Sequence, residues 1–172
     1  MSIFRILLIP IIWYLYVVKE DYAFTAALVV LSGATDVVDG FIARKFNMIS
    51  ELGKFIDPIA DKLTQAALIY CLISRFRNML FVFVLMAVKE TLNAVSFLIL
   101  KKKTGKMLSA SWHGKLATVL LYAMLFLHIV WFGIPSAVSN IFIMVTAAAM
   151  VLSLVLYLVR NIKIVKKTTA KK

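Results

Sequence analysis

The sequence is short of charge, and above all of acidic side chains. Of its 172 residues, 16% are charged, with 20 Lys and Arg against 8 Asp and Glu, whereas 63% are hydrophobic. Soluble domains contain about 45–50% apolar and about 25% charged residues, so this chain has too much apolar surface to hide from water in one core. Its single cysteine, Cys71, excludes an intrachain disulfide. We therefore expect lipid to be the solvent and the protein to be an integral membrane protein.

Six apolar runs follow one another along the chain, and they lack the two-residue alternation of a membrane β-strand. Short segments with charged or turn-forming residues separate them. With about 20 residues per span, six helices use nearly the whole length and leave no room for a separate soluble domain. We therefore predict an all-α integral membrane protein, and treat 1–172 as a single transmembrane domain. Its six transmembrane helices are expected at roughly 3–18, 22–46, 52–73, 78–100, 112–132 and 137–159.

The first run carries Arg5 near its start and is interrupted by Pro10. A secretory signal peptide also has a positive start, but it ends in small residues at a cleavage site. The large residues Ile11-Ile12-Trp13-Tyr14 follow here instead. We therefore expect this run to be retained as the first span.

Lys and Arg are distributed unevenly between the predicted loops. With a cytoplasmic N-terminus, Lys19, Arg75 and Arg77 lie outside, Lys62 and Lys89 lie within spans, and all other Lys and Arg lie on the cytoplasmic side. The positive-inside rule therefore predicts a multi-pass protein of the cell (inner) membrane with both termini cytoplasmic. The net charge of +12 then reflects topology and attraction to anionic lipid in the bilayer. Nucleic acid is not expected as a partner, because the Lys-rich segments lack interleaved aromatic residues.

Four of the eight acidic residues fall in one short stretch that should lie in the membrane. Asp36 and Asp39 belong to the predicted second span, and Asp57 and Asp61 to the third. Residues three and four apart lie on one face of a helix, so each pair shares a face. The intervening turn brings the two faces together as an antiparallel pair, near the cytoplasmic side.

Four carboxylates that face one another in a membrane need cations, because each is costly to bury. The cluster contains no Cys or His, so its oxygen-only donor set favours two divalent ions, Mg²⁺ or Mn²⁺. Paired ions of this kind act on phosphoryl groups. A buried ion-pair network is one alternative, and a metal or proton transporter is another. Transporter sites, however, lie near the midplane, often in two related repeats, whereas this cluster is off-centre and has no counterpart in the second half of the chain.

Three small residues, Gly40, Ala43 and Gly53, occupy the same helix faces as the carboxylates. They leave room for a flat group to lie against the backbone, and Arg44 could bind a phosphate at the rim. From its place in the two spans, the cluster lies roughly 8–11 Å below the headgroups. A polar head could therefore enter from the cytoplasm while acyl chains stay in the bilayer.

The pattern Asp36-x2-Asp39-Gly40-x2-Ala43-Arg44-x8-Gly53-x3-Asp57-x3-Asp61 resembles the signature of the CDP-alcohol phosphatidyltransferases, with every fixed position filled. The resemblance implies an enzyme, commonly a homodimer, that transfers a phosphatidyl group from CDP-diacylglycerol to an alcohol and releases CMP. It implies that Asp36, Asp39 and Asp57 hold two divalent ions, and that Asp61 is both a metal ligand and the general base. The residues that it assigns to CDP binding are Asp39, Gly40, Ala43, Arg44, Ser50 and Gly53.

Further segments are similar to the phosphatidylglycerophosphate synthases of this family, whose acceptor is glycerol 3-phosphate. The matching segments are Phe4-Arg5-Ile6-Leu7-Leu8-Ile9-Pro10, Asp57-Pro58-Ile59-Ala60-Asp61-Lys62, Lys89-Glu90 and Ser109-Ala110-Ser111-Trp112-His113-Gly114-Lys115. By this resemblance Arg5, Lys89 and Lys115 bind the acceptor. Phe97 and Ala117 depart from it, since basic residues are usual at both positions. The family's cardiolipin synthases share the Asp-Pro-x-Ala-Asp-Lys segment, so phosphatidylglycerol is an alternative acceptor, and a polyol phosphate is another.

Three further residues, Lys89, His113 and His128, are interpreted from their positions in the predicted spans. Lys89 is expected to face a polar cavity in preference to pairing with Glu90, because sequence neighbours on a helix point about 100° apart. His113, beside Trp112, is interpreted as an interfacial residue. His128 is interpreted as packed and hydrogen-bonded.

Overall fold

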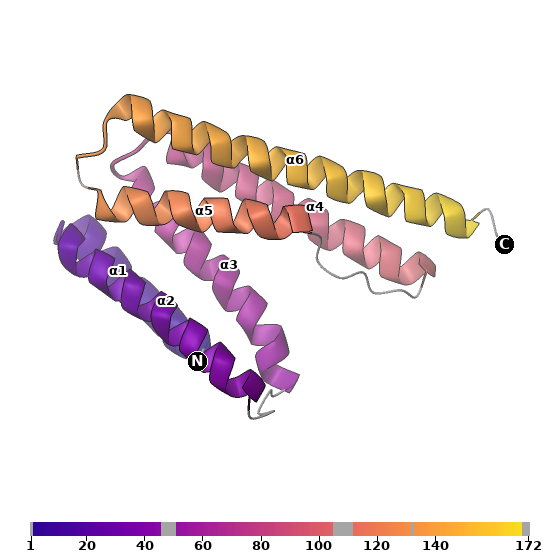
Figure 1. Ribbon diagram of the computed structural model, residues 1–172, viewed down its shortest axis with the longest axis horizontal. Coiled ribbons are helices and arrows are strands. Elements are labelled where there is room, and N and C mark those ends of the chain that lie inside the picture. Colours follow the sequence, from indigo (N-terminus) through magenta and orange to yellow (C-terminus); the bar gives the residue numbers. More distant parts are fainter. Residues whose placement is uncertain (1, 46–50, 105–111, 132, 170–172) are drawn as a thin grey trace. The chain divides into compact units, whose positions relative to one another are not determined.

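The computed structural model describes residues 2–45, 51–104, 112–131 and 133–169, without the side chains of 2–4, 36–37, 39–44, 51–55, 57–58, 103–104 and 165–169. Seven helical elements follow one another (Figure 1): α1 (Ser2–Trp13), the π-helix η1 (Tyr14–Val18), α2 (Tyr22–Lys45), α3 (Glu51–Ile73), α4 (Met79–Thr104), α5 (Trp112–Val130) and α6 (Ser136–Thr169). No strand occurs in these residues, which confirms the all-α prediction for the described part of the chain.

Each predicted apolar run corresponds to one helical segment, with α1 and η1 together forming the first. Three helices are long and apolar enough to cross a membrane, at Met79–Lys102, Trp112–Val130 and Ser136–Ile164. Shorter apolar helices lie at Arg5–Val18 and Tyr22–Thr35. By length and composition α4, α5 and α6 are therefore candidate membrane spans, and the six-span topology stays a prediction.

The chain divides into two compact units, of which the first comprises Met1–Met79 and Leu125–Ile134. Within it, α1 packs against α3, and α2 contacts both α1 and η1. The buried face of α1 and η1 is a stripe at helical spacing, consisting of Arg5, Leu8, Ile12, Leu15 and Tyr16. The buried positions of α3 include Ala60, Gln65, Leu68 and Leu72. In this unit His128 is buried, as expected, with its ring edge-on to Phe76 at a centroid distance of 4.9 Å.

The connection from η1 to α2 is short and well defined. Glu20 has a φ of +53°, in the left-handed region, and turns the chain back. Asp21 then caps α2, since its Oδ1 accepts a hydrogen bond of 3.0 Å from the backbone N–H of Phe24. A connection this short makes the first two helical segments neighbours in space.

The second unit comprises Leu80–Met124 and Pro135–Lys172, and therefore contains most of α4 and α5 and all of α6. Its buried side chains include Met86, Leu121 and Met150. His113 on α5 lies 3.3 Å from Ser153 on α6, between Nδ1 and Oγ. This polar contact joins the two helices in addition to their apolar packing.

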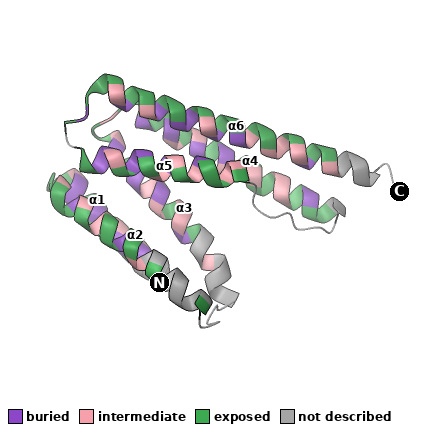
Figure 2. Cartoon of the chain, viewed as in Figure 1, coloured by how far each residue is buried: buried purple, intermediate pink, exposed green. Residues whose placement is uncertain are grey.

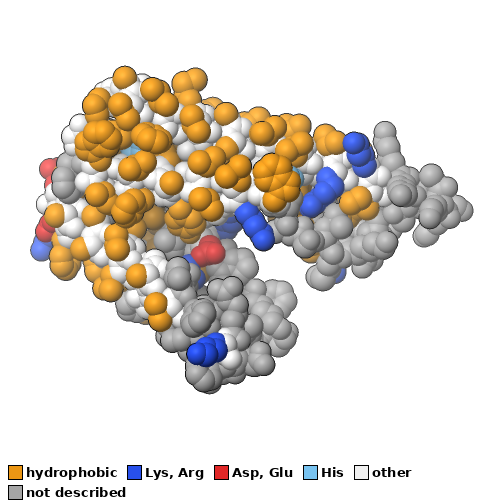
Figure 3. Space-filling view, viewed as in Figure 1, with side chains coloured by type: hydrophobic (Ala, Val, Ile, Leu, Met, Phe, Trp, Pro, Cys, Tyr) orange, Lys and Arg blue, Asp and Glu red, His pale blue; other side chains and the backbone are white. Residues whose placement is uncertain are grey.

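The exposed surface of the helices is unusually apolar compared with that of a soluble protein. Large apolar side chains are exposed on every α-helix, for example Met144 on α6 and Leu98 on α4. Figure 3 shows such side chains covering the visible face over α5 and α6. Several polar side chains are buried instead, including Thr25, Gln65 and Thr146, and Figure 2 shows buried and exposed positions alternating around each helix. Lipid is as apolar as these exposed residues, so this surface fits a bilayer.

Candidate active site

The predicted acidic pattern begins in the second half of α2 and ends in α3. The backbone is helical over both stretches, since α2 continues to Lys45 and α3 begins at Glu51. The structure therefore confirms that both stretches are helical. A helical backbone is the condition for Asp36 to share a helix face with Asp39, and for Asp57 to share one with Asp61. Most side chains of the predicted site lie outside the described ones. They are those of Asp36, Asp39, Asp57 and the predicted CDP-binding residues Gly40, Ala43, Arg44, Ser50 and Gly53.

Asp61, the predicted general base, is the member of the pattern whose side chain is described. Its Oδ1 accepts a hydrogen bond from Nη1 of Arg5, and the two groups form an ion pair between α3 and α1. Arg5 is buried, whereas the Asp61 side chain is 45% exposed. The structure thus brings together a predicted catalytic residue and a predicted acceptor-binding residue that lie 56 residues apart in the sequence.

The packing of α1 on α3 explains this contact. Arg5 continues the buried stripe of Leu8 and Ile12, one turn nearer the N-terminus. Asp61 follows Ala60, which is fully buried and allows the helices to approach closely. Sequence reasoning predicted both residues for the site but not their pairing, because it paired the second predicted span with the third and did not consider the packing of the first span on the third.

Lys62 and Gln65 form a second polar contact on α3 that sequence reasoning did not find. Lys62 Nζ lies 3.5 Å from Oε1 of Gln65, and the Gln65 side chain is buried. The signal available in the sequence was an amide three residues after a lysine within an apolar helix. Lys62 therefore has a local partner, although it is the direct neighbour of Asp61 in sequence.

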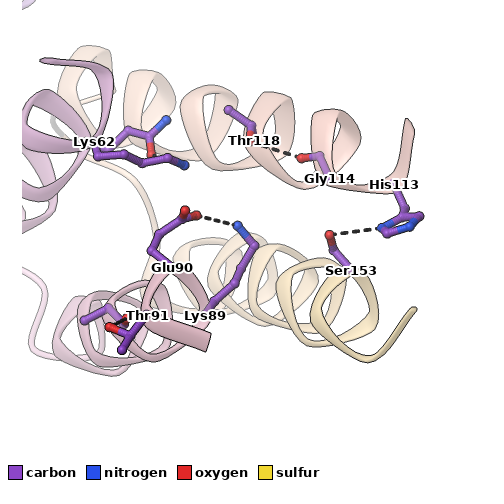
Figure 4. A network of polar contacts seen from close by, with 10 residues as sticks. Lys62, Lys89, Glu90, Thr91, His113, Gly114, Thr118 and Ser153 are labelled. Carbon is purple, nitrogen blue, oxygen red and sulfur yellow. Dashed lines mark hydrogen bonds and ion pairs between the residues drawn. The ribbon is translucent and has the colours of Figure 1, made fainter. Parts of the chain in front are cut away.

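Lys89 on α4 pairs with the residue that follows it. Its Nζ lies 2.7 Å from Oε1 of Glu90 (Figure 4), and Lys89 is 6% exposed. The expectation that sequence neighbours would not pair is therefore wrong. The flexible four-carbon stem of lysine lets the ammonium group reach back over the helix surface, and a buried charge needs a partner. The buried Lys89 remains available as an acceptor-binding candidate, with its charge balanced by Glu90.

The third acceptor-binding candidate, Lys115, is exposed in the first turn of α5. Nearby on the same helix, His113 faces Ser153 of α6 in Figure 4, and its ring also contacts that of Trp112 at 6.0 Å between centroids. Trp112 is highly exposed. These contacts suit the interfacial interpretation of His113, with an added hydrogen-bonding role between helices.

A divalent metal would have to be held by the carboxylates of α2 and α3. No group of three candidate ligands comes together among the side chains that the structure describes, which include Asp61 alone of the four. The properties of Asp61 fit a cation site: its carboxylate attracts a guanidinium and is accessible to a small ion. An oxygen-only donor set of this kind suits Mg²⁺ or Mn²⁺.

Comparison with known proteins identifies the class. The family model for CDP-alcohol phosphatidyltransferase matches residues 1–162. The chain belongs to the CDP-alcohol phosphatidyltransferase family, which confirms the resemblance inferred from the Asp-rich pattern and the expected class of enzyme, a transferase.

Curated relatives carry more specific names. The chain is 34% identical over 122 residues to the CDP-diacylglycerol–glycerol-3-phosphate 3-phosphatidyltransferase of Aquifex aeolicus, covering 69% of this chain and 67% of that protein. It is 46% identical over 65 residues to the protein of the same name from Rickettsia typhi, covering 37% of this chain and 36% of that protein. It is also 47% identical over 72 residues to a cardiolipin synthase (CMP-forming) / mitochondrial hydrolase fusion protein of Schizosaccharomyces pombe, covering 41% of this chain and 12% of that protein. The match thus spans little more than a third of the Rickettsia relative.

Proposed function

We propose that this protein transfers the phosphatidyl group of CDP-diacylglycerol to an alcohol acceptor and releases CMP, in a reaction that depends on two divalent cations, Mg²⁺ or Mn²⁺. The observation that carries the proposal is the complete Asp-x2-Asp-Gly-x2-Ala-Arg-x8-Gly-x3-Asp-x3-Asp pattern on two helices, within a chain matched by this family over residues 1–162. The ion pair of Asp61 supports it, because it indicates an accessible carboxylate in a place that attracts positive charge.

In the proposed reaction, the acceptor oxygen bonds to the phosphorus of the phosphatidyl group and the bond to the CMP oxygen breaks. Asp61 accepts the proton of the attacking hydroxyl and also contributes to metal binding with Asp36, Asp39 and Asp57. When bound, the divalent ions supply charge stabilisation for the pyrophosphate and the leaving CMP. The CDP moiety lies against Gly40, Ala43 and Gly53, with Asp39, Arg44 and Ser50 as its polar partners. Positioning of the reactants compensates for the weakness of a carboxylate as a general base.

Glycerol 3-phosphate is the acceptor that we propose, giving phosphatidylglycerophosphate. The names of the Aquifex and Rickettsia relatives support it, as do the basic residues Arg5, Lys89 and Lys115, which could bind the acceptor phosphate. Phosphatidylglycerol is the second candidate, because the Schizosaccharomyces relative carries the name of a cardiolipin synthase. The two acceptors differ in that the first is a soluble dianion and the second is a lipid.

We propose further that six spans cross the inner membrane, with both termini and the active site on the cytoplasmic side, and that the protein is a homodimer. The excess of Lys and Arg in the predicted cytoplasmic loops supports the orientation. The apolar surfaces of α4, α5 and α6 support insertion in the bilayer. On this topology, the nucleotide and a soluble acceptor enter from the cytoplasm while the acyl chains remain in lipid.

The test uses purified protein in detergent with CDP-diacylglycerol and a panel of acceptors. CMP should appear with glycerol 3-phosphate and Mg²⁺ or Mn²⁺, and chelation with EDTA should abolish it. Asp61→Asn should lower the rate by about 10²–10⁴-fold, the usual contribution of a general base, while Asp21→Asn, which lies outside the predicted site, serves as the control. If CMP appears with phosphatidylglycerol but not with glycerol 3-phosphate, phosphatidylglycerol is the acceptor. Ion flux into sealed vesicles without release of CMP would support a transporter instead.

A further inference from the structure

Arg5 is a charged residue in a place where packing alone would favour an apolar one. The stripe of α1 and η1 that faces the protein consists otherwise of Leu8, Ile12, Leu15 and Tyr16, and Arg5 is only 9% exposed at its N-terminal end. Burying a guanidinium costs several kcal/mol unless a counter-charge is present, and an apolar residue of similar size would avoid that cost. The counter-charge is Asp61, across the contact between α1 and α3.

The partner of Arg5 is one of the four carboxylates proposed to hold the metals. A guanidinium and a divalent cation at the same carboxylate repel each other strongly, because like charges a few ångströms apart interact by several kcal/mol even at an effective dielectric constant of about 20. Asp61 is 45% exposed and so is open to an incoming ion, whereas Arg5 is enclosed by the α1–α3 packing. A divalent ion that binds Asp61 must therefore compete with Arg5, which already forms an ion pair with this carboxylate.

We propose that Arg5 is an internal counter-ion of the metal site: it neutralises Asp61 when no divalent cation is bound, and a divalent cation must displace it from Asp61 to bind. The proposal rests on the proposed function, since it takes Asp61 to be a metal ligand. Displacement also ends the ion pair with Asp61, so that the charge of the guanidinium can contribute to binding an anion, the acceptor-binding role assigned to Arg5. The enzyme would thus expose its acceptor-binding charge only after the metal has bound.

Thermodynamic linkage predicts the direction in which removal of Arg5 changes the affinity for metal. An interaction present only in the metal-free state stabilises that state and weakens metal binding by the same free energy. Removing Arg5 should therefore lower the melting temperature of the metal-free protein and tighten metal binding. A residue that merely supported the metal site would have the opposite effect on metal affinity.

The experiment is a calorimetric titration of the purified protein with Mn²⁺, together with thermal unfolding without metal. Arg5→Gln should lower the Kd for Mn²⁺ about tenfold, equivalent to about 1.4 kcal/mol, and should lower the metal-free melting temperature. Lys62→Gln is the matched control, because it removes one positive charge directly beside Asp61 in sequence, from a side chain that contacts Gln65. Its Kd should change by less than about threefold, the effect of the electrostatic field alone.

Three results would overturn the proposal. The first is an equal Kd in wild type and Arg5→Gln, the second is weaker Mn²⁺ binding in Arg5→Gln, and the third is an equal gain in Arg5→Gln and Lys62→Gln. If Arg5→Gln does not fold, Arg5→Lys takes its place, with a smaller gain in the same direction because lysine lacks the planar fork of arginine. Absence of Mn²⁺ binding to the wild type would overturn the metal-dependent function as well, so the two failures are distinguishable.

Discussion

A single carboxylate fixes the start of α2. Asp21 Oδ1 accepts the hydrogen bond of the Phe24 N–H, one of the backbone donors that have no partner inside the helix. Next to it, Thr25 Oγ1 donates to the backbone carbonyl of Asp21 at 2.8 Å. The capping geometry holds the chain immediately after Glu20, whose positive φ reverses its direction.

Removal of this cap should destabilise the first unit. Asp21→Ala leaves the Phe24 N–H without its acceptor, and we expect a loss of about 1 kcal/mol in the free energy of unfolding. Asp21→Asn retains a capping oxygen and should stay close to wild type. Thermal unfolding of both variants in detergent, followed by circular dichroism, makes the comparison, and equal melting temperatures for Ala and Asn would refute the capping role.

Residue types in the site were easier to predict than their contacts. The Asp pattern follows from spacing along one chain, which a sequence contains in full. The pairing of Lys89 with Glu90 depends on the reach of a flexible side chain over its own helix, and spacing rules that treat side chains as fixed vectors miss it. The pairing of Arg5 with Asp61 depends on the contact of α1 with α3. Neither contact leaves a periodic signal in the sequence.

At the scale of elements, the contact of α1 with α3 positions the candidate site. Leu72 and Ala60 are fully buried on α3, whereas Leu63 on the same helix is 47% exposed. Apolar side chains gain little from leaving lipid, so the stability of this contact comes from close packing. A void in it should therefore be costly, and the same truncation on the exposed side should not.

We expect Leu72→Ala to lower the free energy of unfolding by about 2–4 kcal/mol, because it leaves a cavity. Leu63→Ala, the matched control, should cost less than about 1 kcal/mol. Both are measured as shifts of the unfolding transition in detergent. Similar losses for the two variants would mean that the burial of Leu72 does not reflect tight packing.

The helices themselves were largely predictable, because long apolar runs bounded by charged or turn residues dictate them. The change from α1 to a π-helix at Tyr14–Val18 was not. It depends on backbone hydrogen bonds such as that from Lys19 N–H to the Tyr14 carbonyl, at 3.0 Å. A π-helical turn is rare, and an apolar composition carries no signal that would distinguish it from an α-helical turn.

For the whole molecule, the exposed apolar residues and the basic loops together specify how the protein sits in a bilayer. The α3–α4 turn carries the exposed residues Arg75 and Arg77, whereas a second basic group, at the C-terminal end of α4 and just beyond it in the sequence, consists of Lys101, Lys102, Lys103 and Lys106. The proposed topology puts the first on the outer side and the second on the cytoplasmic side.

Limited trypsin digestion of sealed vesicles tests this arrangement. With a C-terminal epitope tag, inside-out vesicles should lose the tag, because the Lys and Arg residues that precede it in the sequence face the protease on the proposed topology. Right-side-out vesicles should keep the tag on a fragment cut at Arg75 or Arg77. The reverse assignment, or the same fragment from both preparations, would contradict the proposed orientation.

The length of α6 has a practical consequence. Its 34 residues form a helix of about 51 Å, whereas the hydrocarbon core of a bilayer is about 30 Å thick. On the proposed topology, the surplus turns form a straight stalk that begins in lipid and ends in water. A soluble protein fused to this stalk in continuous helical register would inherit a fixed orientation, and could serve as a fiducial marker for electron cryomicroscopy of an enzyme otherwise too small to align.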